Sequence, residues 1–177
     1  MNATISSSNF SARETALRAR LGIPADAKQA LILAESSHWD PNWLYTSTEY
    51  YSRFVENNLL QALSELAQEP SRVYSIECMF FLRMFWERHP ELQETIRSLI
   101  NQGRLRLTGS GVTSPDTLLP DAEALLRDLL LGQEWLRTNG MQSEPILAYF
   151  PDCFGHTPAL PSLLNAAGFQ MTAFSLL

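Results

Sequence analysis

Short apolar runs of strand length alternate along this chain with longer segments in which hydrophobic residues recur every three or four positions. The short runs predict β-strands, and the longer segments predict amphipathic helices with one buried face. Helical sequence separates each predicted strand from the next, which is typical of right-handed βαβ crossovers in a mainly parallel sheet. We therefore expect an α/β fold built from parallel βα units. The expected strands span 29–36, 71–78, 104–111, 145–150 and 169–177, and the expected helices span 46–69, 80–103 with a break at Pro90, 121–138 and 157–168.

The first 26 residues differ from the rest of the chain. Residues 1–12 are rich in Ser and Asn, and Ser11 is placed to cap a short helix that runs to Leu21 and ends at Gly22. We expect an N-terminal arm with a short helix at 1–26. The remaining residues, 27–177, are enough to bury one substantial core, because the chain is 45% hydrophobic and only 18% charged.

Composition excludes several classes of partner. A net charge of -6 without a basic stripe argues against nucleic acid, so a small neutral or polar partner is expected. No apolar run approaches the ~20 residues needed to cross a bilayer, so we expect no membrane span. Cys78 and Cys153 are far apart and outside any C-x-x-C spacing, which fits a reducing compartment and predicts a cytoplasmic protein.

The stretch AESSHWDPNWL, residues 34–44, follows the first predicted strand and places a histidine and an aspartate two positions apart. In extended backbone His38 and Asp40 face one side, and Trp39 faces the other. An imidazole nitrogen and a carboxylate oxygen both suit Zn²⁺, and the lack of nearby thiolates favours a catalytic over a structural site. The spacing alone leaves open a simpler interpretation, in which Asp40 caps the turn before Pro41 and His38 is an ordinary loop histidine.

A second polar loop, YFPDCFGHTP, follows the fourth predicted strand and carries Asp152. The carboxyl ends of parallel strands gather at one edge of a sheet, so this loop and the His38 loop are expected to converge there. Asp152 is then a candidate third metal ligand. The alternative is that Asp152 satisfies backbone N–H groups of the following turn, while His156 begins a helix.

With both loops in view, the sequence resembles the N-terminal catalytic domain of glycoside hydrolase family 38, the zinc-dependent α-mannosidases. The resemblance extends from about Ala30 to the last residue, and three motifs occur in the family's order, each after a predicted strand. They are HWDPNWL for the His-x-Asp-x-x-Trp motif, GSGVTSPDTLLPDAEALLRDLLLGQEWL for the Gly-rich loop with its acidic residue and helix, and YFPDCFGHTPALPSLLNAAGF for the Asp-x-Phe-Gly-His segment. The resemblance implies the (β/α) barrel of that domain, here incomplete.

The resemblance also implies roles for individual residues. His38, Asp40 and Asp152 would bind Zn²⁺, and Asp152 would in addition be the nucleophile of a retaining α-mannosidase, acting on mannose-containing oligosaccharides. Trp43 would offer a stacking face to a sugar, and Asp116 would contact sugar hydroxyls or shape its loop. For three further residues we expect supporting or unrelated roles: a structural hydrogen bond for Glu77, a surface position for His89, and orientation of the Asp152 loop for His156.

Two groups of the family's site have no identified counterpart in these 177 residues. They are a histidine that is the fourth zinc ligand and an aspartate that is the general acid/base, whereas retaining hydrolysis needs two carboxyl groups ~5 to 5.5 Å apart. We therefore expect the front part of a longer enzyme, continuous or associated with further C-terminal domains, whose activity in isolation is in question. Two other functions remain alternatives: a metal-dependent carbohydrate deacetylase, for which the usual ligand spacing is not found, and a non-catalytic sugar-binding fragment.

Overall fold

The computed structural model describes residues 12–31, 35–142 and 146–174, and the chain divides into two compact units, 1–33 and 34–177. The first unit contains the helix α1 (Ala12–Arg20), which is followed by Gly22 in a left-handed conformation at φ 66°. The short N-terminal helix predicted before Gly22 is therefore confirmed. Its expected cap, Ser11, lies outside the described residues.

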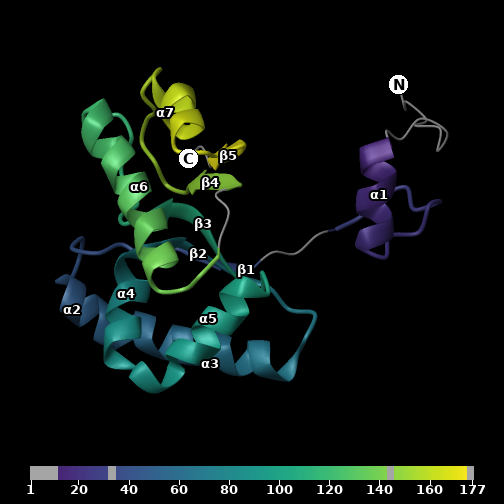
Figure 1. Ribbon diagram of the computed structural model, residues 1–177, viewed down its shortest axis with the longest axis horizontal. Coiled ribbons are helices and arrows are strands. Elements are labelled where there is room, and N and C mark those ends of the chain that lie inside the picture. Colours follow the sequence, from purple (N-terminus) through teal and green to yellow (C-terminus); the bar gives the residue numbers. More distant parts are fainter. Residues whose placement is uncertain (1–11, 32–34, 143–145, 175–177) are drawn as a thin grey trace. The chain divides into compact units, whose positions relative to one another are not determined.

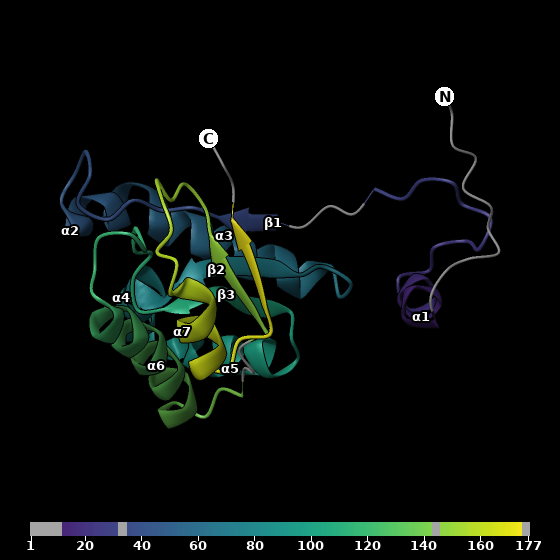
Figure 2. The ribbon, with the colours of Figure 1, turned by 90° about the horizontal axis from the view of Figure 1, so that it is seen from above.

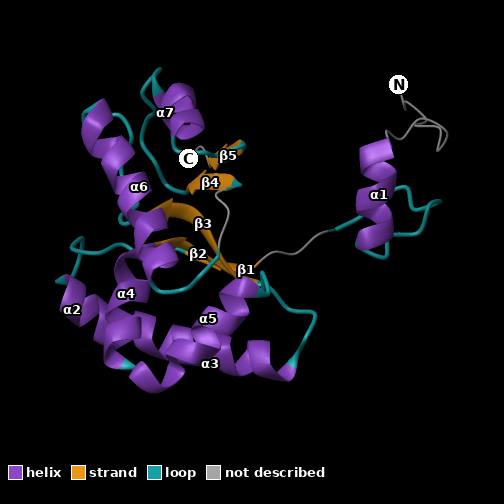
Figure 3. Cartoon of the chain, in the orientation of Figure 1, coloured by secondary structure: helices purple, strands orange, loops and turns teal. Residues whose placement is uncertain are grey.

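The second unit alternates strands with helical segments along its length (Figure 3). This order confirms the predicted α/β class, and every strand pairing is parallel. The strands are β1 (Glu35–Ser37), β2 (Tyr74–Cys78), β3 (Leu105–Gly111), β4 (Leu147–Phe150) and β5 (Met171–Phe174). The helical segments are α2 (Ser47–Tyr50), η2 (Tyr51–Val55), α3 (Glu56–Gln68), α4 (Met79–Arg88), η3 (Pro90–Leu92), α5 (Gln93–Asn101), α6 (Ala122–Thr138) and α7 (Leu160–Ala166).

Two details differ from the sequence-based expectation. Among the described residues the strands form a three-stranded sheet, in the order β1-β2-β3, and a separate pair, β4-β5, which Figure 2 shows side by side. The first predicted strand, 29–36, is also only partly a strand: residues 29–31 are not in a strand and Leu31 is 87% exposed, whereas residues 32–34 lie outside the described residues. The prediction was therefore wrong for residues 29–31, and in the described part of the chain the pairing of β1 with β2 begins at Glu35, opposite Tyr74.

The larger core lies between the three-stranded sheet and the helices α3, α4 and α5, which lie together on one side of β2 and β3 (Figure 1). Alternate residues of the strands point into it, among them Ile76 of β2 and Leu105 and Leu107 of β3. The helices contribute apolar faces at helical spacing, of which Phe81 and Phe85 are fully buried. The opposite face of β2 is thereby left for polar side chains.

A second core joins α6, α7 and β4. Its buried residues include Leu125 and Leu129 of α6 and Ala148 and Phe150 of β4. Phe150 is the last residue of β4, so this packing fixes the point at which the strand ends and the Asp152 loop begins.

The long helix predicted at 46–69 is present as three consecutive segments. Thr46 and Glu49 form a reciprocal capping box at its start, with the backbone N–H of Glu49 donating to the Thr46 side chain and that of Thr46 donating to the Glu49 carboxylate. A π-helical segment, η2, then interrupts the α-helical hydrogen bonding before α3 begins. The insertion places Tyr51 and Val55 fully in the core.

Strands β2 and β3 approach each other unusually closely around Glu77. Their register shifts between Ile76 and Cys78, so that β3 carries extra residues opposite this point. Gly109 lies in that irregular stretch, and a Cβ atom built on it would be 1.6 Å from the carbonyl oxygen of Glu77. Only glycine fits there, because the atom in the way belongs to the backbone of a central strand.

We expect Gly109→Ala to lower the free energy of unfolding by roughly 3 kcal/mol or more, or to prevent folding, because β2 and β3 must separate to admit the methyl group. Chemical denaturation of the variant measures this loss. Gly155→Ala is the control, since its new Cβ would meet only the flexible Leu118 side chain, at 3.0 Å. Equal stability losses in the two variants would contradict the explanation.

His89 lies in the predicted helix break before Pro90, but it is less exposed than expected. Its side chain is 19% exposed, stacks on Phe85 at 4.3 Å between ring centroids, and contacts Glu56 at 2.9 Å and Glu91 at 3.1 Å. Burial lowers the pKa of His89, but the hydrogen bonds to the two glutamates outweigh burial and raise it above its usual 6.5.

A raised folded-state pKa stabilises the protein fully below the unfolded value and loses that contribution as pH rises through the folded value. We therefore expect His89→Gln to reduce stability more at about pH 6 than at about pH 9, as measured by denaturant unfolding. In a Glu56→Gln background this difference between the two pH values should shrink. A stability loss that is independent of pH would rule out the charged pair as its cause.

Candidate metal centre

The register of β1 on β2 determines which way His38 points. Ser37 is the partner of Ile76, so the next residue of each chain segment, His38 and Glu77, come side by side on the face opposite the larger core. The neighbouring Trp39 points the other way, is 5% exposed and packs edge-on against Phe81. The predicted alternation of His38, Trp39 and Asp40 is thus present in the structure.

Three candidate ligands meet at this edge. One ligand atom each from His38, Asp40 and Asp152 lies within 4.8 Å of the others. The Nε2 atom of His38 is 3.2 Å from Asp40 Oδ1 and 3.9 Å from Asp152 Oδ2. Ligand atoms on a tetrahedral Zn²⁺ are about 3.3 Å apart at ordinary bond lengths, so this set of one nitrogen and two oxygens is suited to hold a metal ion.

Glu77 supports the candidate centre from β2. Its side chain is 1% exposed; Oε2 is 2.9 Å from His38 Nδ1, and Oε1 accepts a hydrogen bond from the backbone N–H of Trp39 at 3.0 Å. Burial raises the pKa of Glu77 against the opposing effect of these bonds. For His38 burial lowers the pKa, but the hydrogen bond to Glu77 and the carboxylates of Asp40 and Asp152 raise it overall.

The Asp152 loop holds its aspartate in a sparsely populated conformation. Asp152 has φ 52°, a left-handed conformation that aspartate tolerates better than most residues but that still costs free energy. It follows directly on Pro151 and the end of β4, whose last residue, Phe150, is anchored in the second core. The carboxylate is thereby directed toward His38 by a short, constrained turn.

Thr117 links this loop to the one after β3. Its buried hydroxyl donates to the carbonyl of Gly155 at 3.2 Å, and it lies 3.0 Å from His156 Nδ1. The His156 ring also contacts Phe174 of β5, at 4.7 Å between centroids. His156 lies outside the three-residue ligand group, and its expected role in orienting the Asp152 loop stays a prediction.

A pocket of about 360 Å³ opens over the three candidate ligands. Trp43 lines it and is 73% exposed. Asp116 lines the same pocket and accepts a weak hydrogen bond from the Cys153 thiol at 3.5 Å. The structure thus brings all five sequence-predicted site residues to one pocket.

Two residues near the site were not singled out from the sequence. Thr117 is one threonine of the loop that follows the third predicted strand. Its buried hydrogen bond to Gly155 depends on how two loops pack. Phe154, 83% exposed at the pocket, occurs within the Asp-x-Phe-Gly-His segment and could have been singled out there.

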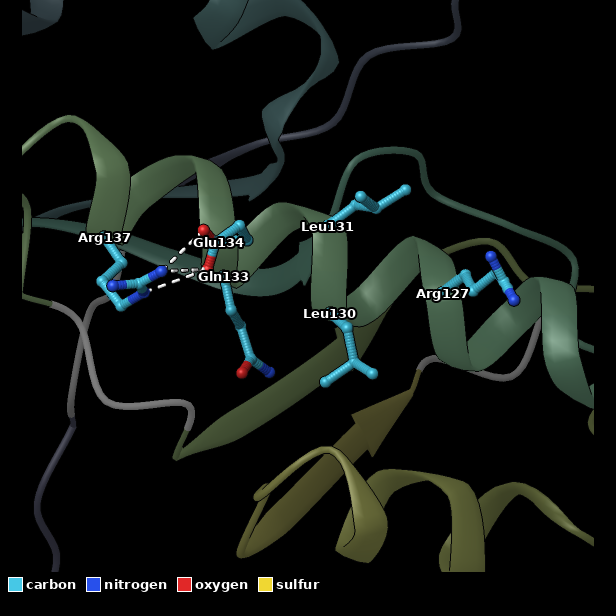
Figure 4. A pocket seen from close by; sticks show the side chains of 6 residues that line it. All are labelled: Arg127, Leu130, Leu131, Gln133, Glu134 and Arg137. Atoms are coloured by element: carbon cyan, nitrogen blue, oxygen red, sulfur yellow. Dashed lines mark hydrogen bonds and ion pairs between the residues drawn. The ribbon is translucent and has the colours of Figure 1, made fainter.

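A second pocket lies along α6 and differs from the pocket over the candidate ligands, because one helix alone forms it (Figure 4). All six residues that line it belong to that one helix, and Arg137 is paired with Glu134 at 2.6 Å. A surface of this kind, with its charges already paired, offers no convergent polar groups for catalysis.

The fold and the ligand group define a parallel βα protein with a candidate metal centre at the carboxyl ends of its strands. The chain belongs to the family described as "Glycosyl hydrolases family 38 N-terminal domain", whose model matches residues 28–176.

Several relatives are α-mannosidases. The chain is 32% identical over 143 residues to alpha-mannosidase 2 of Spodoptera frugiperda, and 33% identical over 154 residues to lysosomal alpha-mannosidase of Cavia porcellus. These alignments cover 80% of this chain but 13% and 15% of the two relatives. The crystal structure of an alpha-mannosidase from Enterococcus faecalis V583 shares the fold, with a TM-score of 0.68 at 24% identity, over 80% of this chain and 16% of that one.

Among the helices of the described residues, none combines the length and the apolar character that a membrane-spanning segment needs.

If the three candidate ligands form one centre, a zinc titration monitored by isothermal calorimetry should give a stoichiometry of one ion per chain. We expect His38→Ala and Asp152→Asn each to weaken binding by at least about 10-fold, since each removes one donor of the set. Asp116→Asn is the matched control, because Asp116 lines the pocket without belonging to the ligand group. Unchanged affinity in both ligand variants would exclude the centre.

Proposed function

We propose that this chain is part of the catalytic domain of a retaining α-mannosidase, which hydrolyses α-mannosidic bonds in mannose-containing oligosaccharides with Asp152 as nucleophile. The observation that carries the proposal is the convergence of His38, Asp40 and Asp152 within 4.8 Å beneath a pocket. Membership of glycosyl hydrolase family 38 supports it independently. The proposed catalytic-domain portion is 27–177, with 1–26 as an N-terminal arm.

Zinc is the proposed ion. The donor set is one imidazole nitrogen and two carboxylate oxygens, which Zn²⁺ accepts, and the softer Cys153 thiol lies nearby but outside the group. When bound, zinc would provide Lewis acidity and a positive charge beside the reacting sugar. Asp40 and His38 would hold the ion, and Asp152 would both hold it and face the substrate.

Asp152 is suited to nucleophilic attack by its placement. Its loop is constrained by the left-handed turn and by the buried end of β4, so the carboxylate needs little reorganisation before reaction. In the proposed first step an Asp152 oxygen bonds to the anomeric carbon as the glycosidic C–O bond breaks, and the leaving oxygen takes a proton from an acid. Water then cleaves the mannosyl ester, so the anomeric configuration is retained.

Substrate binding is assigned to the pocket wall. The exposed indole of Trp43 offers an apolar face on which a sugar ring can stack, and the carboxylate of Asp116 can accept hydrogen bonds from sugar hydroxyls. We further place the protein in the cytoplasm, which the free thiols of Cys78 and Cys153 support.

Trapping with a fluorinated mannosyl fluoride tests the nucleophile directly. Fluoride departs without strong help from a general acid, so the reagent isolates the first step from the residues that protonate natural leaving groups. We expect the zinc-loaded chain to gain one fluoromannosyl group on the peptide that contains Asp152, as detected by mass spectrometry.

Asp152→Asn is the matched variant, because asparagine tolerates the same left-handed turn while it lacks the nucleophilic charge. It should remain folded and unlabelled. A label on Asp116 or Asp40, or mannose binding by the zinc-loaded wild type without any label, would contradict the proposed role; the second result would favour a non-catalytic sugar-binding protein.

A further inference from the structure

We propose that Glu77 is a positioning residue of the metal centre, which holds His38 in the tautomer that leaves Nε2 free to bind the ion and fixes the backbone between the ligands His38 and Asp40. This inference rests on the proposed metal centre. Glu77 is a buried carboxylate, and its hydrogen bonds to residues 38 and 39 give it this positioning role.

Glu77 contacts two consecutive residues with its two oxygens. Oε2 lies 2.9 Å from His38 Nδ1, and Oε1 accepts from the backbone N–H of Trp39 at 3.0 Å. The first contact orients the imidazole ring, and the second anchors the peptide that joins the two ligands. Both ligands on this loop are therefore held by a single side chain.

The hydrogen bond to Nδ1 decides the tautomer of His38. A neutral imidazole carries one N–H, and both Glu77 and Asp40 can only accept it when ionised. The contact of Nδ1 with the buried Glu77, at 2.9 Å, is shorter than the contact of Nε2 with the more exposed Asp40, at 3.2 Å, so we place the proton on Nδ1. The Nε2 lone pair is then directed toward Asp40 and Asp152, at 3.2 and 3.9 Å. Metal-binding histidines commonly depend on such a partner at the other ring nitrogen.

The protein backbone holds Glu77 itself firmly. Ile76 and Cys78 on either side are fully buried, so the strand cannot rotate to redirect the side chain between them. The close approach of Gly109 to the Glu77 carbonyl fixes the backbone from the neighbouring strand. With only 1% of its side chain exposed, Glu77 makes its contacts almost shielded from water.

Glu77→Gln separates this role from simple packing, because the two side chains have nearly the same shape. The Trp39 N–H requires an acceptor, which places the glutamine carbonyl there and turns the amide NH₂ toward His38 Nδ1. Nδ1 must then accept, and the proton moves to Nε2, where it blocks the metal. The substitution should therefore invert the tautomer.

Two measurements on the full chain test the proposal. In ¹⁵N-histidine NMR spectra of the metal-free protein, at a pH well above the His38 pKa, the wild type should have the proton on Nδ1 and Glu77→Gln should have it on Nε2. In competition titrations with a zinc chelator, Glu77→Gln should bind zinc about 10- to 100-fold more weakly than the wild type. Tyr51→Phe is the control for stability, since it removes the hydroxyl donor of a partly buried hydrogen bond to Glu56, away from the centre.

The outcomes distinguish this proposal from the metal centre on which it rests. Failure of the wild type to shift the His38 Nε2 resonance on zinc addition would overturn the centre itself. If the wild type binds zinc normally, then equal affinity in Glu77→Gln would overturn the role of Glu77. A proton on Nε2 of His38 in the wild type would also overturn the role of Glu77. This NMR measurement uses the wild type alone, so it does not depend on whether a variant folds.

Discussion

The parallel register between β1 and β2 is the constraint on which the candidate centre depends. Because Ser37 pairs with Ile76, His38 follows beside Glu77 on the face opposite the larger core. A slip of one residue would turn His38 into the core and bring Trp39 toward the pocket. The apolar contacts of Trp39 with Phe81 oppose that slip, so a hydrophobic side chain holds its two polar neighbours in place.

The two cores position the two halves of the site. The larger core fixes β1 and β2, and through them His38, Asp40 and Glu77. The smaller core fixes the end of β4, and through it the constrained turn at Asp152. Thr117 adds a buried polar link between the loops after β3 and β4. The ligands thus come from loops, but rigid strands determine where the loops start.

Much of this arrangement could be predicted from the sequence. The alternation of apolar runs and amphipathic segments is periodic and local, so the α/β class follows from it, and the helix break at Pro90 follows from the missing N–H of proline. His38, Asp40 and Asp152 could be placed at one edge because parallel strands align their carboxyl ends. The absence of strand at 29–31, the separation of the β4-β5 pair, and the contact of Glu77 with His38 could not be predicted. They depend on register, on a strand irregularity that requires Gly109, and on packing between distant segments.

X-ray absorption at the zinc edge of the zinc-loaded chain tests the central claim most directly, since it identifies the donor atoms. Cys153 lines the same pocket as His38, Asp40 and Asp152, so sulfur is a real competitor for the ion. We expect only nitrogen and oxygen neighbours at about 2.0 to 2.2 Å, including the multiple-scattering signature of one imidazole that disappears in His38→Ala. A sulfur neighbour at about 2.3 Å, or an imidazole signal that persists in that variant, would contradict the central claim.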